Sequence, residues 1–107
     1  MTAQLNHTIV PAHDSRKSAT FLSEMLDLPE PVPFGPFLCV KTGNGVTLDF
    51  MDWGDHPMSI QHYAFLVSED EFDTIFARIT ERGPDYFADP HLSEKGQINH
   101  HDGGRGV

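Results

Sequence analysis

Seven histidines in a chain of 107 residues make metal binding the first chemistry to consider in this sequence. His7 is third in the run LNH and His62 is third in the run IQH, 55 positions later (62 − 7 = 55). Neutral imidazole is a common ligand of divalent metal ions, and two imidazoles with one carboxylate leave open positions for a substrate. Because the two histidines occupy the same place in two similar segments, we predict that they bind one ion. In the alternative, each packs on a sheet face and hydrogen-bonds to the backbone.

Asp49 is a carboxylate on a predicted strand and is a candidate for a ligand or pocket role. It lies in the run from Val46 to Trp53, whose hydrophobic and polar residues alternate as in a strand with one buried face. On this pattern Thr47, Asp49 and Met51 share the other face. We predict a ligand or pocket role for Asp49, with Thr47, Met51 and Trp53 lining a substrate pocket. The alternatives are a solvent-facing Asp49 and a Trp53 that belongs to the core or to an interface.

Two further residue types invite a chemical interpretation. Cys39 is the single cysteine and lies in the apolar run FLCV, so we interpret it as a small buried hydrophobic residue rather than a nucleophile. Arg105 ends a polar stretch over 89–105 that is rich in Gly and His, and we predict that it contacts an anionic group of the substrate. The alternative for this stretch is a mobile loop.

The first half of the chain supplies the elements that must position these residues. Residues 5–10 form a short run that ends in three β-branched residues before Pro11, which is typical of a strand. Asp14 is suited to cap a helix that begins near Ser15, and prolines from Pro29 onward end it and form an extended loop or turn over 29–36. Strands are expected over 37–42 and 46–53, joined by a hairpin at GNG.

The second half repeats the order of the first. Residues 60–67 (IQHYAFLV) resemble a strand, and Ser68 with Glu71 has the form of a capping box. Apolar residues at helical spacing then run to the stop signal Arg82-Gly83. A short strand is expected over 85–88, followed by a loop over 89–105. No closing hairpin follows, which indicates an incomplete second half or completion by another chain.

Two such units, each opening with a strand histidine, resemble the vicinal-oxygen-chelate superfamily of glyoxalases, bleomycin-resistance proteins and extradiol dioxygenases. The resemblance covers the whole chain and implies an α+β fold of paired βαβββ modules that form a half-open barrel. Residues 1–107 would be one domain, with modules at 1–55 and 56–107 and the last strands of the second module missing. It also implies that His7, Asp49 and His62 are metal ligands, and that a further Glu ligand would follow the segment 103–107.

The composition narrows the classes of function. Seven basic against 16 acidic residues give a net charge of −9, which disfavours nucleic acid and anionic membranes as partners. No apolar run is long enough to span a bilayer, no secretory signal is visible, and one cysteine permits no intrachain disulfide, so a cytoplasmic protein is expected. An open sheet edge predicts a homodimer.

The resemblance leaves the reaction open. The first hypothesis is an enzyme that uses a divalent ion (Fe, Zn, Ni or Mn) to act on a small oxygen-rich molecule, as a glyoxalase-like lyase or isomerase or an extradiol-type dioxygenase. The second is a metal-free protein that binds a small molecule in the manner of bleomycin-resistance proteins. The third is a folded domain that acts by association alone. Fold does not decide among them.

Overall fold

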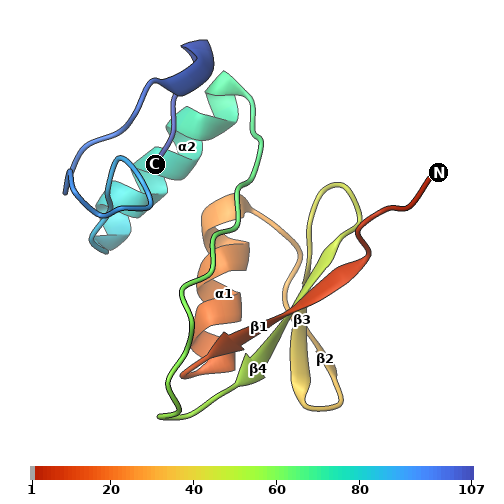
Figure 1. The fold of residues 1–107 in the computed structure, drawn as a ribbon. Helices are drawn as coiled ribbons and strands as arrows, with labels where there is room; N and C mark the ends of the chain where they lie inside the picture. Colours follow the sequence, from red (N-terminus) through yellow and green to blue (C-terminus); the bar gives the residue numbers. More distant parts are fainter. Residues whose placement is uncertain (1) are drawn as a thin grey trace. The chain divides into compact units, whose positions relative to one another are not determined.

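The computed structural model describes residues 2–107 as two compact units, which divide between Ser59 and Ile60. The first unit contains a four-stranded sheet and one helix, and the second contains one helix and an irregular returning segment (Figure 1). Strands and helices are both present, and the sheet is mixed and not closed, so the predicted α+β class is confirmed.

The sheet of the first unit has the strand order β1-β4-β3-β2. Its strands are β1 (His7–Ala12), β2 (Val32–Phe34), β3 (Phe37–Lys41) and β4 (Thr47–Asp52). β1 runs parallel to β4, whereas β3 is antiparallel to both of its neighbours. β1 and β4 are therefore adjacent although about forty positions separate them in the sequence.

Helix α1 (Ser15–Leu26) begins and ends where its flanking residues satisfy the free backbone groups. The Asp14 carboxylate accepts a hydrogen bond from the Lys17 N–H at 3.1 Å, as predicted for a capping residue. Asp27 adopts a left-handed conformation with φ of 53° and donates its N–H to the Ser23 carbonyl. The helix thus stops three positions before the prolines that were expected to end it.

One face of the sheet packs against α1 and forms the core of the first unit. Its buried side chains come from the helix, from β1 and from both central strands: Ala12, Ala19, Met25, Leu38, Val40, Leu48 and Phe50. Val40 is fully buried. The predicted alternation of β4 is confirmed, because Leu48 and Phe50 are buried whereas Thr47, Asp49 and Met51, which alternate with them, are only half-buried.

The loop predicted over 29–36 is partly wrong, because Val32–Phe34 forms the edge strand β2. Pro33 obscured this strand in the sequence. A proline lacks the N–H that a central strand needs, but an edge strand has one side without a partner and tolerates it. Only the pairing with β3 reveals the strand.

Helix α2 (Glu69–Arg82) in the second unit follows its predicted signals at both ends. The Ser68 hydroxyl accepts from the Glu71 N–H at 3.1 Å, and the Glu71 carboxylate accepts from the Ser68 N–H at 2.9 Å. Gly83 ends the helix with φ of 86°, in the left-handed region that favours glycine. The predicted capping box is confirmed.

The strand predicted over 60–67 is wrong: within residues 2–107 this segment forms no strand. In place of the strand predicted over 85–88, the structure has a single β-bridge between Phe87 and Lys95. A second β-bridge joins Asn99 to Gly106. A strand requires a neighbouring strand for its backbone hydrogen bonds, and local sequence does not supply one. The stretch expected to be a loop also holds a short 3₁₀ helix, η1 (His101–Gly103).

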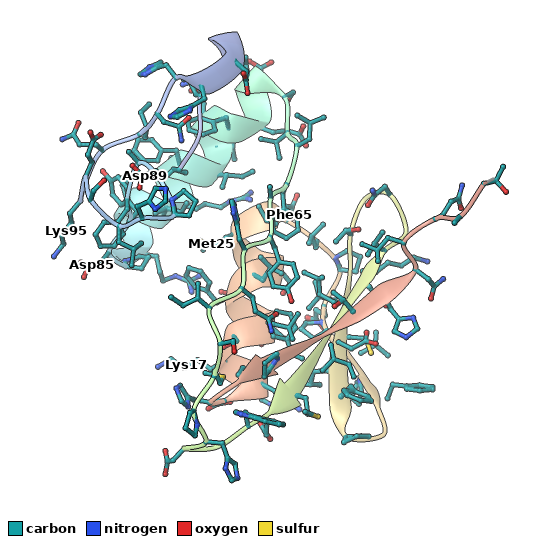
Figure 2. All side chains as sticks on the ribbon, viewed as in Figure 1. Lys17, Met25, Phe65, Asp85, Asp89 and Lys95 are labelled. Atoms are coloured by element: carbon teal, nitrogen blue, oxygen red, sulfur yellow. The ribbon has the colours of Figure 1, made fainter. Side chains whose placement is uncertain are left out.

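The returning segment of the second unit covers part of α2. Phe76 of the helix lies edge-on to the Tyr86 ring, with 5.3 Å between ring centroids, and it stacks on Phe72 at 5.9 Å. Figure 2 labels Asp85 and Lys95 in this segment, whose charged groups approach to 3.4 Å. Among residues 2–107, neither helix has the length and hydrophobicity that crossing a membrane would require.

Candidate functional site

The face of the sheet that points away from α1 holds the candidate site in the first unit. Strand register places one residue from each strand in a row across this face: Ile9, Asp49, Cys39 and Val32. Ile9 is 47% exposed and Val32 is 61% exposed. In this structure the row is thus a carboxylate and a thiol flanked by two exposed aliphatic side chains.

Asp49 is the polar centre of this row. Its side chain is half-buried, and its Oδ1 atom is buried with no hydrogen-bond partner among the residues that the structure describes. A buried polar atom without a partner costs about 1–3 kcal/mol. An unsatisfied carboxylate oxygen between the aliphatic side chains of this row is a position at which a cation or a hydrogen-bond donor would be stabilised.

His7 lies on the same face, on the neighbouring strand. Its register partner is Thr47, two residues before Asp49, so the two Cα atoms are roughly 8 Å apart from the usual strand spacing and rise. The His7 Nδ1 atom lies 2.7 Å from Oδ1 of Asn6. In the tautomer that donates from Nδ1 to this amide oxygen, Nε2 keeps its lone pair. This tautomer is the one that binds a metal through Nε2.

Cys39 is the register partner of Asp49 on the other side. The pKa of its thiol is raised to about 11, first by burial and then by the hydrogen bond to Asp49 and the negative charge of that carboxylate. A thiol with so high a pKa is protonated at neutral pH and is a poor nucleophile. The structure therefore agrees with the interpretation of Cys39 as a non-nucleophilic residue, although the residue is half-buried rather than buried and faces Asp49 across the strand pair.

His62 belongs to the second unit, in the extended segment before α2, and its side chain is exposed. Its neighbour Tyr63 donates its hydroxyl to the Gln61 side chain. No group of three His, Cys, Asp or Glu side chains within the described part of the chain forms a metal site. The joint role of His7, Asp49 and His62 in one metal site therefore stays a prediction.

The remaining predicted pocket residues of the first unit lie on or beside β4. Thr47 and Met51 share the face of Asp49 and are half-buried. Trp53 follows the strand, is 38% exposed and donates its indole N–H to the Pro57 carbonyl at 3.1 Å. His56 lies edge-on to its ring, with 5.8 Å between centroids. Local contacts thus fix the position of Trp53 in the loop after β4.

Arg105 is held by α2 of the second unit. Its guanidinium forms ion pairs with Glu69 at 2.6 Å and Asp73 at 2.8 Å, and it lies 4.5 Å from the centre of the Phe72 ring. The hydrogen bonds that Arg105 donates to the Asp73 and Glu69 carboxylates raise its pKa above the usual value. The predicted contact with a substrate anion would compete with both carboxylates.

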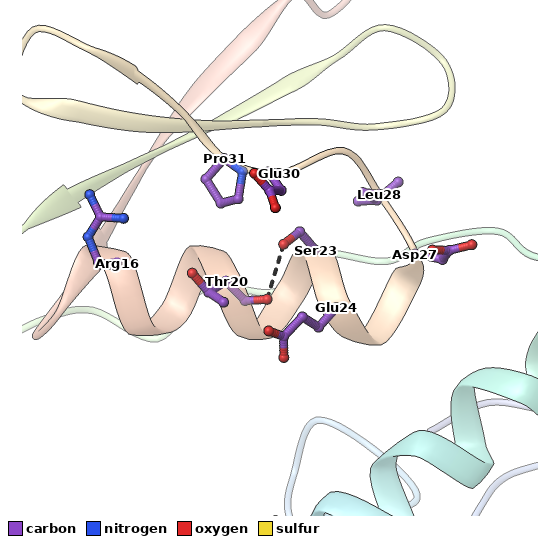
Figure 3. Close-up of a pocket in the computed structure, with 8 residues that line it drawn as sticks. All are labelled: Arg16, Thr20, Ser23, Glu24, Asp27, Leu28, Glu30 and Pro31. Carbon is purple, nitrogen blue, oxygen red and sulfur yellow. Dashed lines mark hydrogen bonds between the residues drawn. The ribbon is translucent and has the colours of Figure 1, made fainter.

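A groove of about 420 Å³ runs along α1, between the helix and the loop that leads to β2 (Figure 3). Its charged lining residues are Arg16, Glu24, Asp27 and Glu30, and the Ser23 hydroxyl at its floor donates to the Thr20 carbonyl at 3.1 Å. None of the predicted site residues lines this groove. It lies along the helix, whereas Asp49 lies on the sheet face that points away from α1.

The residues on the open sheet face fit a divalent ion. A carboxylate oxygen without a partner and an imidazole with a free Nε2 are the oxygen and nitrogen donors that iron, manganese and zinc accept. The pairing of Cys39 with Asp49 across β3 and β4 was not among the sequence predictions. The signal was present, because a hairpin centred on Asn44 places residues five before it and five after it opposite each other.

Comparison with solved structures identifies the class to which this fold belongs. The chain is a member of the vicinal-oxygen-chelate superfamily, as the sequence analysis predicted. Two solved proteins, from Alicyclobacillus acidocaldarius (glyoxalase/bleomycin resistance protein/dioxygenase) and Bacillus cereus (a possible glyoxalase), superpose with TM-scores of 0.55 and 0.54. They are 17% and 20% identical, covering 81% and 89% of this chain and 71% and 93% of their own, so they show the fold alone.

The more similar relatives are two oxidases. The protein described as oxidase ChaP-H2 is 56% identical, with a TM-score of 0.91 over 98% of this chain and 82% of its own. Oxidase ChaP-H1 is 55% identical, with a TM-score of 0.90 over 97% of this chain and 83% of its own. No protein-family model matches the chain, and comparison with curated proteins gives no match.

Proposed function

We propose that the protein is a metal-dependent oxidase that acts on a small oxygen-rich molecule. The observation that carries the proposal is the buried Oδ1 of Asp49, which has no partner among residues 2–107 and shares its sheet face with His7. The names of the two relatives that are more than half identical favour oxidation over isomerisation. Dioxygen would be the oxidant.

Iron(II) is the ion that best suits this proposal. Zinc has no redox chemistry, whereas two histidines and one carboxylate are the ligands of many iron(II) enzymes that use dioxygen. His7, Asp49 and His62 would hold the ion, which supplies adjacent open positions for the substrate and the oxidant. His62 comes from the second unit, so the proposal requires that the two units bring their histidines to one ion.

The residues of this chain have defined tasks in that site. Asn6 accepts from Nδ1 of His7 at 2.7 Å and so fixes the ring with Nε2 available. Ile9 and Val32 flank Asp49 and Cys39 with exposed apolar surface, on which the carbon skeleton of a substrate would lie while its oxygens face the carboxylate. Apolar walls around a few polar groups are typical of small-molecule sites.

Anaerobic titration with iron(II), followed by elemental analysis, tests the proposal. The wild type is expected to bind one ion per site, and His7→Ala, His62→Ala and Asp49→Asn are each expected to bind at least tenfold more weakly. His91→Ala, at an exposed loop histidine, is the matched control and is expected to bind as the wild type does. Addition of a vicinal diol or hydroxyketone to the loaded protein should then start dioxygen uptake.

Two results would overturn the proposal. The first is a wild-type protein that binds no divalent ion. The second is equal affinity in the wild type and in all three ligand variants. In the first case, quenching of Trp53 fluorescence by a cationic glycopeptide would instead favour the metal-free binding protein considered above.

A further inference from the structure

The hairpin tip between β3 and β4 carries a chemical feature that the proposed metal site does not use. Asn44 is followed by Gly45. The other two asparagines of the chain, Asn6 and Asn99, are each followed by a histidine. An asparagine loses its side-chain amide when the backbone nitrogen of the next residue attacks the side-chain carbonyl carbon. Because glycine has no side chain to crowd this nitrogen, the reaction is easiest at an Asn-Gly pair.

The turn leaves the Asn-Gly pair accessible. Asn44 and Gly45 are both exposed, inside the hairpin that the Thr42 N–H closes on the Val46 carbonyl at 2.8 Å. Gly45 has φ of 85°, and a Cβ atom added there would meet nothing within 4 Å. The pair therefore has both the room and the access to water that the reaction needs.

The contacts of Asn44 favour attack at its side-chain carbonyl. The Thr42 hydroxyl donates to Oδ1 of Asn44 at 2.7 Å and lies 2.9 Å from the Val46 carbonyl oxygen, so these two acceptors share its single proton. A donor thus faces the oxygen on which negative charge develops during the attack. The Gly45 N–H donates to the Thr42 carbonyl at 3.1 Å, and this bond must open first. Exposed loop tips open locally at little cost in free energy.

The other two asparagines are in different surroundings. Asn99 donates its Nδ2 to the Ala88 carbonyl and accepts from the His101 N–H at 3.2 Å, so both ends of its amide are bound. Oδ1 of Asn6 lies 2.7 Å from Nδ1 of His7. In both cases the residue whose nitrogen would attack carries an imidazole side chain. The structure therefore favours reaction at Asn44.

We propose that Asn44 is a site of spontaneous deamidation. The Gly45 nitrogen gives its proton to solvent and attacks Cγ of Asn44, which closes a succinimide ring. The side-chain nitrogen takes a proton from solvent and leaves as ammonia. Water then opens the ring at one of its two carbonyl carbons, which gives aspartate or isoaspartate at this position. In total one water is taken up and one ammonia is lost, and no oxidant or reductant takes part.

The product changes the hairpin that aligns β3 with β4. Either form adds one negative charge to a chain whose net charge is −9. Isoaspartate also adds one carbon to the backbone of the turn between the paired residues Lys41 and Thr47. The inference does not rest on the proposed function, because none of the reacting atoms belongs to the metal site.

Peptide mapping by mass spectrometry, during incubation of the protein in mildly alkaline buffer, tests the proposal. A synthetic peptide of residues 40–48 serves as the clock, and the incubation ends when this peptide is fully converted. The wild-type protein is expected to accumulate a more acidic form. Its mass gain, the difference between water and ammonia, should lie at Asn44, with Asn6 and Asn99 intact.

Two glycine substitutions in the same turn give a matched control. Gly45→Ala crowds the attacking nitrogen and is expected to lose the acidic form. Gly43→Ala, on the other side of Asn44, meets nothing within 4 Å and is expected to form it as the wild type does. Because the positive φ of Gly45 disfavours alanine, Asn44→Gln is the second test. Its longer side chain disfavours ring closure, so it is also expected to lose the acidic form. Circular dichroism checks that each variant is folded.

The proposal fails on any of three results. The first is an unmodified Asn44 in the wild-type protein when the peptide is fully converted. The second is deamidation of Asn6 or Asn99 as fast as that of Asn44. The third is an acidic form that accumulates in Asn44→Gln, or in a folded Gly45→Ala, as fast as it does in Gly43→Ala.

Discussion

At the scale of single residues, hydrogen bonds decide which side chains of this protein are available for chemistry. Asp49 and Asp52 lie three positions apart on β4 but differ in whether their carboxylates have hydrogen-bond partners. Oδ1 of Asp49 is buried without a partner in the described residues, whereas Asp52 accepts from the Ser15 N–H at 2.7 Å. Asp52 is therefore satisfied by the N-terminus of α1, and Asp49 is the carboxylate left for a ligand.

The pairing of Asp52 with Ser15 makes stability depend on pH. Hydrogen bonds from Ser15 lower the pKa of Asp52 below its ordinary value of 3.8 in the folded protein. A lowered pKa stabilises the fold fully above the ordinary value, and this contribution is lost as the pH falls through the folded pKa. We expect Asp52→Asn to lower the free energy of unfolding at pH 7, and the deficit to shrink below about pH 4.

Urea unfolding of the wild type and Asp52→Asn between pH 7 and pH 3 measures this deficit. Asp55→Asn, which removes an exposed carboxylate from the loop after β4, controls for the change in net charge. A deficit in Asp52→Asn that is the same at every pH would contradict the proposed linkage.

At the scale of elements, the helices are set by local sequence and the sheet by packing. The capping box of Ser68 and Glu71 satisfies two free N–H groups at the start of α2. Its sequence signal spans only the four residues from Ser68 to Glu71. β2 and β3 depend instead on each other and on the hydrophobic face that α1 covers. We therefore expect stability to depend on helix capping in the second unit and on side-chain burial in the first.

Removing the cap of α2 should destabilise the second unit. Ser68→Ala deletes the hydroxyl that accepts from the Glu71 N–H at 3.1 Å, and we expect a loss of about 1 kcal/mol. Ser68→Asp keeps an acceptor at the same position and is expected to retain most of the stability. Urea denaturation followed by helical circular dichroism checks this, and equal losses in both variants would show that the cap contributes nothing.

Two valines on adjacent strands test the packing of the sheet. Val40 on β3 is fully buried beneath α1, and Val32 on β2 is 61% exposed. We expect Val40→Ala to cost about 2 kcal/mol of unfolding free energy, from lost burial and the cavity that remains. Val32→Ala should stay within about 0.5 kcal/mol. Equal effects in chemical denaturation would mean that burial does not distinguish the two faces.

At the scale of the whole molecule, exposed apolar surface points to association. Ile60 and Leu66, in the segment before α2, are 95% and 101% exposed, and Phe34 at the sheet edge is 73% exposed. Strands β1 and β2 end the sheet of the first unit without a further strand in the described chain. Exposed apolar side chains and open sheet edges favour pairing with another chain.

We therefore expect a homodimer in solution, as the sequence analysis predicted. Sedimentation equilibrium should give twice the mass of one chain, and Leu66→Asp should shift the protein toward the monomer, because it places a charge in the exposed apolar run. Leu92→Asp, at a leucine that is 61% exposed in a loop of the second unit, is the matched control. A monomeric wild type, or equal weakening by both substitutions, would contradict this prediction.

The sequence by itself determined the features that depend on neighbours within a few residues. The cap at Asp14, the capping box at Ser68, the stop at Gly83 and the alternation of β4 were all predicted from such patterns. It also carried the resemblance that identified the superfamily. These signals are local because helix caps and strand faces are fixed by side chains close in sequence.

The tertiary structure decided what depends on distant partners. Only the pairing with β3 shows that Val32–Phe34 is a strand, and the lack of a partner within residues 2–107 explains why residues 60–67 are not. The parallel pairing of β1 with β4 brought His7 to the face of Asp49, and the register of β3 brought Cys39 beside it. Backbone hydrogen bonds between strands join residues far apart in the chain, so local patterns do not encode them.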